Sequence, residues 1–192
     1  MPRASAAVAA QTAQQVLDSA TELFAERGFS EVSLDDVAHA AGVTRGAVYH
    51  HYRNKRGLFR AVASRLQSKV AEAVVEAAER SGADARGQLR AGSHAFLDAI
   101  TAGPAVRVLL VDAPAVVGWQ EWRRLDAENS GAHLREALQA TGVPDLLLDA
   151  MTAHLSGAMN GAALWIAQNP NGAEAREQAH TVLDRVLAAV IT

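Results

Sequence analysis

The sequence contains no cysteine and few aromatic residues, and both absences narrow what the protein can be. Without cysteine the chain forms neither disulfides nor thiolate metal sites, which fits a cytoplasmic location. Aromatic residues make up 5% of the 192 residues, whereas alanine is abundant, and this balance favours closely packed helices over sheets. The chain also lacks an uninterrupted run of about 18 apolar residues, so we expect no contact with a membrane.

Lysine is scarce as well: two lysines stand against 16 arginines. Together with the excess of alanine, this bias is typical of a GC-rich, bacterial genome. Catalytic signatures are missing, because the sequence has neither a glycine-rich phosphate loop nor a nucleophile elbow. A metal site built from histidine and aspartate stays open as an alternative, but the spacing of these residues is not diagnostic. We therefore expect no enzymatic activity, no cofactor and no metal.

Acidic residues are absent from one long stretch. Between Asp36 and Glu72 there is no acidic residue, whereas seven basic residues occur there. They are Arg45, Arg53, Lys55, Arg56, Arg60, Arg65 and Lys69. Residues 1–71 carry nine basic and six acidic side chains, but residues 72–192 carry nine and fifteen. A solvated helix face would mix both signs, so the pattern predicts a nucleic-acid contact at one end of an acidic protein.

Local start and stop signals predict an all-α fold with about nine helices. Thr12 and Gln15 form a capping-box pattern at the start of the first helix, which Gly28 ends. Residues 1–11 are expected to form a disordered arm. The other helices are expected at about 34–41, 45–52, 55–80, 88–102, 105–111, 119–140, 145–168 and 173–191. The chain thus divides into a helix-turn-helix domain (residues 12–60) and a helical ligand-sensing and dimerisation domain (residues 61–192).

The second and third helices repeat one start signal. Ser33 and Thr44 are placed as N-caps, and valines on either side of each cap form hydrophobic staples, so we expect a small rigid unit. A helix enters the major groove of DNA through its N-terminal turns. The candidate DNA contacts are therefore Ser33, Thr44, Arg45, Gly46, Ala47, Tyr49, His50, His51, Tyr52 and Lys55.

The chemistry of these side chains assigns them different roles. The Arg45 guanidinium suits the O6 and N7 atoms of a guanine, and Ala47 is small enough to approach a thymine methyl group. For Tyr52 a position in the core, packed on the first helix, stays open as an alternative. For Arg53 and Arg56 the open alternative is simple exposure to solvent.

This segment resembles the tetracycline-repressor (TetR) family of bacterial regulators. The resemblance covers about residues 12–60 and rests on F-A-E-R-G-F at the end of the first helix and on V-A-x-A-A-G-V-T-R-G-A-V-Y-H-H-Y-x-N-K-x-G-L-F over residues 37–59. It implies that the third helix is the recognition helix, that Tyr49 touches DNA and that Lys55 binds a phosphate. Two positions depart mildly from the common pattern, namely His51 and Gly57.

The helix expected at 145–168 is apolar on two opposite faces. Its large residues suit a core, whereas its small residues allow a second helix to approach closely. We therefore expect a homodimer formed by this helix and the last one, and the four-helix interface usual in the family agrees. The candidate interface residues are Ala150, Ala153, Gly157, Gly161, Leu164, Val182, Val186 and Val190.

The second domain also combines aromatic surface with a few polar groups, which is the general form of a small-molecule site. Candidate ligand residues are Phe96, Asp112, Trp119, Trp122, His154, Met159 and Trp165, although a plain core role stays open for each aromatic ring. We expect a repressor that binds a palindromic double-stranded DNA operator as a homodimer and is released by a small hydrophobic or aromatic effector. The alternatives are an activator, or a regulator that is constitutive or controlled by a protein partner.

Overall fold

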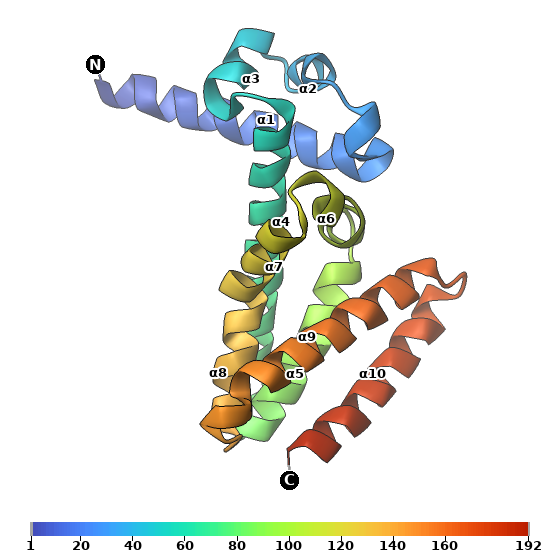
Figure 1. Ribbon diagram of the computed structural model, residues 1–192. Coiled ribbons are helices and arrows are strands. Elements are labelled where there is room, and N and C mark those ends of the chain that lie inside the picture. Colours follow the sequence, from blue (N-terminus) through green and yellow to red (C-terminus); the bar gives the residue numbers. More distant parts are fainter. Residues whose placement is uncertain (1, 192) are drawn as a thin grey trace.

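A computed structural model describes residues 2–191, and these residues form an all-α fold, as predicted. Figure 1 shows a head formed by α1, α2 and α3, with α4 leading away from it into a larger helical body. The helices are α1 (Pro2–Glu31), α2 (Leu34–Ala40), α3 (Arg45–Tyr52), α4 (Lys55–Arg80), α5 (Ala85–Thr101), η1 (Val106–Asp112), α6 (Ala113–Val116), α7 (Trp119–Asp126), η2 (Ala127–Gly131), α8 (Ala132–Ala140), α9 (Asp145–Gln168) and α10 (Gly172–Val190).

Helix α1 begins at Pro2, so the arm predicted to be disordered is helical over residues 2–11. The Thr12 hydroxyl does not cap the helix but donates a hydrogen bond to the Val8 carbonyl one turn earlier, at 3.0 Å. Alanine, which has the highest helix propensity, is frequent in this stretch and extends the helix without a cap. Met1 lies outside the described residues.

Helix α4 joins the head to the body and has the predicted bounds. Asn54 caps its start, where the side-chain oxygen accepts a hydrogen bond from the Gly57 amide at 2.8 Å. Its buried residues begin at Leu58 and continue to Ala71, and the helix packs against α1 at one end and α5 at the other. One continuous helix therefore contacts both parts of the molecule.

The helix predicted over residues 119–140 is divided by a π-helical turn, η2. Asn129 leaves helical geometry there, with φ −114° and ψ −106°, and its side-chain amide donates to the Leu125 carbonyl at 2.7 Å. A Cβ atom at Gly131 would lie 3.1 Å from the Asp126 carbonyl oxygen, so the turn favours a residue without a side chain. Asp126, the last residue of α7, and Ser130 within the π-helical turn are both buried.

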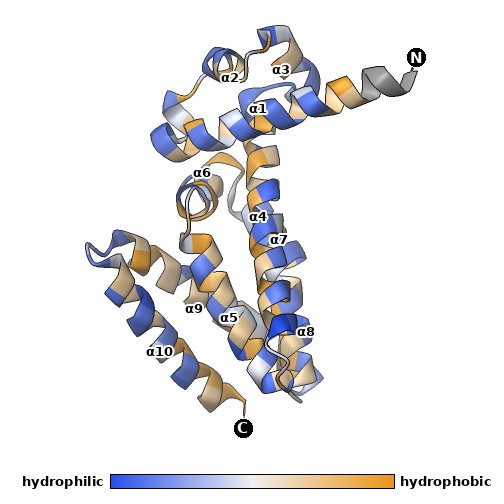
Figure 2. Ribbon diagram, turned by 180° about the vertical axis from the view of Figure 1, so that it is seen from behind, coloured by the Kyte–Doolittle hydropathy of each residue, from blue (hydrophilic) through white to orange (hydrophobic). Residues whose placement is uncertain are grey.

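Helices α9 and α10 form the outer part of the body. Hydrophobic colours predominate along α9 in Figure 2, and its large residues Leu148, Leu155, Met159 and Ile166 are buried as predicted. Among residues 2–191 no single helix is long and apolar enough to cross a membrane. The bent pair of α5 and Val106–Val116 meets the length and composition criteria together, but its two parts are inclined at 89°.

Candidate nucleic-acid interface and ligand cavity

Three phenylalanine rings hold the head together. The Phe59 ring of α4 packs edge-on against Phe24 and Phe29, with ring centroids 5.1 and 5.2 Å apart. Val48 is the buried residue of α3 and belongs to the same core, whereas Arg45, Tyr49 and His50 of that short helix are exposed.

The helix caps that the sequence predicted for α2 and α3 are present. The Ser33 hydroxyl accepts a hydrogen bond from the Asp36 amide at 3.1 Å, and the Asp36 carboxylate accepts one from the Ser33 amide at 2.8 Å. The Ser33 hydroxyl also donates to the Asp36 carboxylate at 2.7 Å, and this hydrogen bond, followed by the one from the Ser33 amide, lowers the pKa of Asp36. The Thr44 hydroxyl accepts a hydrogen bond from the Ala47 amide at 3.2 Å. Each cap fixes the first turn of its own helix.

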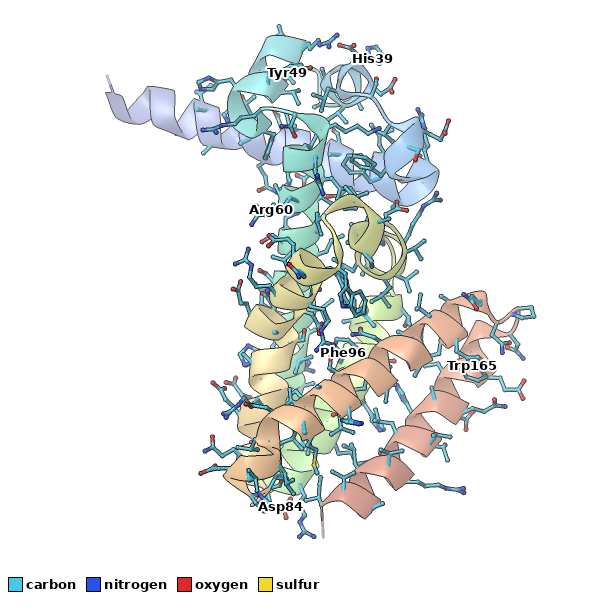
Figure 3. All side chains as sticks on the ribbon, viewed as in Figure 1. His39, Tyr49, Arg60, Asp84, Phe96 and Trp165 are labelled. Carbon is cyan, nitrogen blue, oxygen red and sulfur yellow. The ribbon has the colours of Figure 1, made fainter. Side chains whose placement is uncertain are left out.

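The N-terminal half of α3 is exposed. Thr44, Arg45, Gly46, Tyr49 and His50 all face solvent, and Tyr49 is 42% exposed although it is a large aromatic residue. Figure 3 shows Tyr49 at the outer end of the head, away from the body. A Cβ atom at Gly46 would come no closer than 3.8 Å to its nearest neighbour, so packing within the head does not require this glycine. Of the predicted contacts, Ala47 and His51 are half-buried.

Arg45 is held in place before any DNA is bound. One guanidinium nitrogen lies 2.8 Å from the Asp35 carboxylate, and another lies 3.4 Å from the Tyr49 hydroxyl. The hydrogen bond with Tyr49 and the charge of Asp35 raise the pKa of Arg45. The two charged side chains are 58% and 60% exposed, and such exposed pairs contribute about 0–1 kcal/mol. A guanine base or a phosphate can therefore replace Asp35 at little cost.

Two of the predicted DNA contacts bind to α1 in this structure. The Tyr52 hydroxyl donates a hydrogen bond to the Ala13 carbonyl at 2.8 Å, and burial raises the pKa of Tyr52. This arrangement favours the core role left open for Tyr52. The Lys55 ammonium donates to the Ser30 carbonyl at 3.1 Å and lies 4.4 Å from the centre of the Phe29 ring.

The departure from the family pattern at Gly57 has a steric reason. A Cβ atom at this position would collide with the Tyr52 carbonyl oxygen. At the junction between α3 and α4, Arg53 has a positive φ of 64°, and the Asn54 amide donates to the Tyr52 carbonyl at 2.7 Å across it. Glycine at position 57 therefore fits this tight turn.

A cavity of about 300 Å³ lies between α4, α5, α8 and α9. Two of the predicted ligand residues, Phe96 and Met159, line it, and Figure 3 shows Phe96 within the body. Its polar lining includes Asp126, Ser93, Ser130 and Ser156, all buried, which sequence analysis missed. Small polar residues on buried helix faces were a usable signal for the serines, and the spacing of four residues from Trp122 was one for Asp126.

The Asp126 carboxyl is the buried acidic group of this cavity. It is 5% exposed and accepts a hydrogen bond from the Ser156 hydroxyl at 2.8 Å. Burial raises the pKa of Asp126, against the smaller opposing effects of Ser156 and of the Arg123 charge. A buried carboxyl without an adjacent base is a typical feature of a functional site.

The other five predicted ligand residues do not line this cavity. Asp112 instead accepts a hydrogen bond from the Phe29 amide at 3.0 Å and so connects η1 to the end of α1. The buried Trp122 donates its indole N–H to the Leu109 carbonyl at 2.7 Å, and Trp119, which is 62% exposed, stacks on it. The reason is the same for both tryptophans: the break at Gly118 turns α7 towards α4 and η1.

The remaining two residues lie on the outer face of α9. The His154 ring is exposed and its Nδ1 lies 2.8 Å from the Ala150 carbonyl oxygen. Trp165 is 44% exposed and lines an apolar groove between α9 and α10. Both lie on the face with small residues, opposite the cavity. Within residues 2–191 no group of three His, Cys, Asp or Glu side chains is placed to hold a metal ion.

The predicted dimer face is uncovered in the single chain. Exposed members are Ala150, Ala153, Gly157, Gly161, Val182 and Val186, whereas Leu164 and Val190 are half-buried. A Cβ atom at Gly157 or Gly161 would meet nothing within 4 Å. The groove beside them has a volume of about 480 Å³ and includes Val182 and Val186 in its wall.

Two protein-family models match the chain. "Bacterial regulatory proteins, tetR family" matches residues 16–62, and "Tetracyclin repressor-like, C-terminal domain" matches residues 87–190. The chain belongs to the TetR family. Members of this family are DNA-binding transcription regulators, which confirms the resemblance and the expectation that the chain is not an enzyme.

Individual TetR-family proteins show the same relationship. The chain is 41% identical over 76 residues to the HTH-type transcriptional regulator AcrR of Shigella flexneri. The matched stretch covers 40% of this chain and 35% of that protein. It is 36% identical over 86 residues to the HTH-type transcriptional activator FasR of Mycolicibacterium smegmatis, covering 45% and 39%. The chain thus spans about a third of the length of the curated relatives it matches.

A solved TetR-family structure matches over nearly the whole length. The crystal structure of a transcriptional regulator from Pectobacterium atrosepticum has a TM-score of 0.76 and 29% identity, and the match covers 97% of both chains. The head and the body are therefore combined here as they are in that TetR-family regulator.

Proposed function

We propose that this TetR-family protein is a ligand-responsive repressor that binds a palindromic operator as a homodimer in the cytoplasm. The observation that carries the proposal is the position of α4. Its first turn contacts the head through Phe59, and its later residues Val74, Val75 and Ala78 form one wall of the cavity. A molecule in the cavity therefore touches α4, the helix that directly follows the recognition helix α3.

A ligand changes DNA affinity only if it binds the two orientations of the head with different affinities. Ligand that displaces the α4 wall changes the inclination of this helix and with it the spacing of the two recognition helices in a dimer. Half-sites are read about one helical turn apart, or a multiple of it, so altered spacing weakens binding to the palindrome.

A second connection between body and head supports this coupling. The Phe29 amide is bound by Asp112, and the Arg107 guanidinium donates to the Glu26 carbonyl at 3.2 Å. Both side chains belong to η1, the segment that follows α5 and packs against α4. Movement in the body can thus reach both α1 and α4.

Self-association follows from the exposed small-residue face of α9 and the groove beside α10. Two such faces placed together form a four-helix interface in which glycines permit close approach. The alternative of activation is favoured by the name of one relative, the activator FasR. Transcription from a reporter that carries the selected DNA site distinguishes the two, since a repressor lowers and an activator raises expression.

The test is selection of binding sites from a random DNA pool, followed by affinity measurements on the recovered sequence. We expect a palindrome. Arg45→Ala should weaken its binding by about 1–3 kcal/mol and relax the preference at one base position. Lys55→Ala should weaken all sequences alike and reduce the slope of log K against log salt by about one.

Arg86→Ala provides a matched control, because Arg86 is exposed at the start of α5, in the body rather than in the head. Its affinity for the selected DNA should equal that of the unaltered protein. Recovery of no common sequence, or equal losses in all three variants, would contradict the assignment of α3 as the reader.

A further inference from the structure

The lining of the cavity has charge of one sign. Three carboxyl groups contribute to it, from Glu79, Asp126 and Glu136, and neither lysine nor arginine is among the lining residues. His133 is the other titratable group of the lining, and its Nδ1 lies 3.8 Å from the Glu136 carboxylate. Glu79 and Glu136 are exposed and mark the mouth, whereas Asp126 is buried inside. The field within the cavity therefore attracts cations and repels anions.

Two buried hydroxyl groups in the cavity have no protein partner. Ser93 and Ser130 are 4% and 7% exposed, and neither hydroxyl oxygen makes a hydrogen bond within residues 2–191. Buried polar groups in native proteins are nearly always hydrogen-bonded. Both oxygens are available to accept hydrogen bonds from a ligand in the cavity.

Asp126 likewise lacks a charged partner. Among the described residues it forms no ion pair, and the side chains that hydrogen-bond to it, Ser156 and Asn160, are neutral. Arg123 acts on it only through space, because its side chain is exposed and lies beside the Trp119 ring, 6.0 Å from the ring centre. A buried carboxylate is costly unless a cation or several donors compensate it.

Apart from Gln88 and Ser156, the rest of the lining is apolar. Leu89, Phe96, Leu134 and Met159 supply hydrophobic and aromatic surface next to these polar groups. A cation near the face of an aromatic ring is also attracted by the ring itself. The cavity volume of about 300 Å³ is at the lower end of the range for small-molecule sites.

We propose that the effector is a small apolar cation, such as an amine, whose charged nitrogen binds at Asp126 and whose body packs on Phe96 and Met159. The hydroxyl groups of Ser93 and Ser130 accept the hydrogen bonds of the ammonium group. This inference rests on the proposed function, because it names the ligand class of the same effector cavity. A carboxylate of equal size would meet three acidic groups, and a neutral alcohol would leave Asp126 without a counter-charge.

Three compounds that share one body and differ in the head group test the inference: 4-phenylbutylamine, 4-phenylbutan-1-ol and 4-phenylbutanoate. Isothermal titration calorimetry gives their affinities, and displacement from the selected operator gives their effect on DNA binding. We expect the amine to bind at least about tenfold more tightly than the other two and to release the DNA.

Asp126→Asn should remove the preference for the amine, since the amide keeps the size of the side chain but not its charge. Glu128→Gln is the matched control: Glu128 lies two residues further along, pairs with Arg124 on the surface and is not part of the lining. This control should leave the preference intact. Thermal unfolding shows whether each variant is folded.

A second measurement uses the unaltered protein. A protonated carboxyl has no charge to attract the amine, and burial raises the pKa of Asp126, so the affinity for the amine should fall as the pH is lowered, beginning above the range of an exposed aspartate. Titrations at a series of pH values measure this fall. The affinity for the alcohol should not change with it.

The outcomes separate the inference from the proposed function. If the alcohol or the carboxylate binds as tightly as the amine and releases the operator, the proposed ligand class is wrong, but the proposal that a small molecule in this cavity releases the operator is supported. If none of the three binds and the operator complex is unaffected, the ligand class is refuted, whereas the proposed repressor is tested separately by the operator selection. Binding of the amine that is unchanged by Asp126→Asn would refute the role of Asp126.

Discussion

The hydrogen bond between Asp112 and the head is the contact whose removal is most informative. The Asp112 carboxylate accepts a hydrogen bond from the Phe29 amide at 3.0 Å, although the two residues are 83 positions apart in sequence. The Asp112 side chain is only 18% exposed. Hydrogen bonds to charged groups contribute about 1.5–3 kcal/mol. Asp112→Ala should therefore lower the free energy of unfolding by about that amount.

For a chain of this size, 1 kcal/mol corresponds to a change in Tm of about 2–4 °C. The expected decrease in Tm for Asp112→Ala is therefore about 3–12 °C, and urea unfolding followed by circular dichroism gives the free energy directly. Asp149→Ala is a matched control, because Asp149 is 86% exposed and pairs only with Arg135, so its loss should cost less than about 1 kcal/mol.

The same variant tests the coupling between the body and the head. Once the Asp112 contact is lost, movement of η1 no longer reaches α1 through it, so a bound effector should release the operator less completely. If Asp112→Ala is as stable as Asp149→Ala and responds fully to effector, the contact has neither the structural nor the coupling role described above.

Three further predictions concern other contacts. Tyr52→Phe removes the 2.8 Å hydrogen bond to the Ala13 carbonyl, so urea unfolding should show that the free energy of unfolding falls by about 0.5–1.5 kcal/mol, while the affinity for the operator stays unchanged. Weaker DNA binding at full stability would show instead that the Tyr52 hydroxyl touches DNA. Gly157→Leu should give a folded monomer by gel filtration with light scattering, because a Cβ atom there meets nothing within 4 Å in its own chain, whereas the leucine side chain would block the approach of a second α9. A persistent dimer would place the interface elsewhere. Burial and the neighbouring His94 ring lower the pKa of His180 from 6.5. The unfolded state therefore binds a proton at His180 more readily than the folded state does, and the free energy of unfolding should fall as the pH drops below about 6.5. Urea midpoints at pH 7.5 and 5.5 check the sign of this effect, and His180→Gln should reduce the difference.

Much of the head could be predicted from sequence because its signals are local. The N-caps Ser33, Thr44 and Asn54 each act on the next turn of the same helix, and all three are present. The exposure of Arg45 and Tyr49 followed from the same short-range pattern. Tyr52 was ambiguous because its partner, Ala13, lies 39 residues away.

The cavity could be predicted only in part because it depends on long-range packing and on a local irregularity. Phe96 and Met159 lie on buried helix faces that periodicity identifies. Asp126 faces inward because it follows the buried Trp122 by four residues on one face of α7, a spacing that a helix over 119–140 already contains, and only its acidic side chain argued against burial. Asp112 and Trp122 were misplaced because polarity or ring size alone does not reveal which backbone group a side chain will meet.

The spacing of the two recognition helices tests the central claim most directly. The chain has no cysteine, so His39→Cys introduces a single spin-label site, and His39 is exposed on α2 in the head. Electron–electron double resonance then measures the distance between the two labels in the dimer, with operator bound and after release by the tightest-binding compound of the head-group series. The account predicts two distinct distance distributions, the one on DNA being narrow. Identical distributions in both states would contradict it.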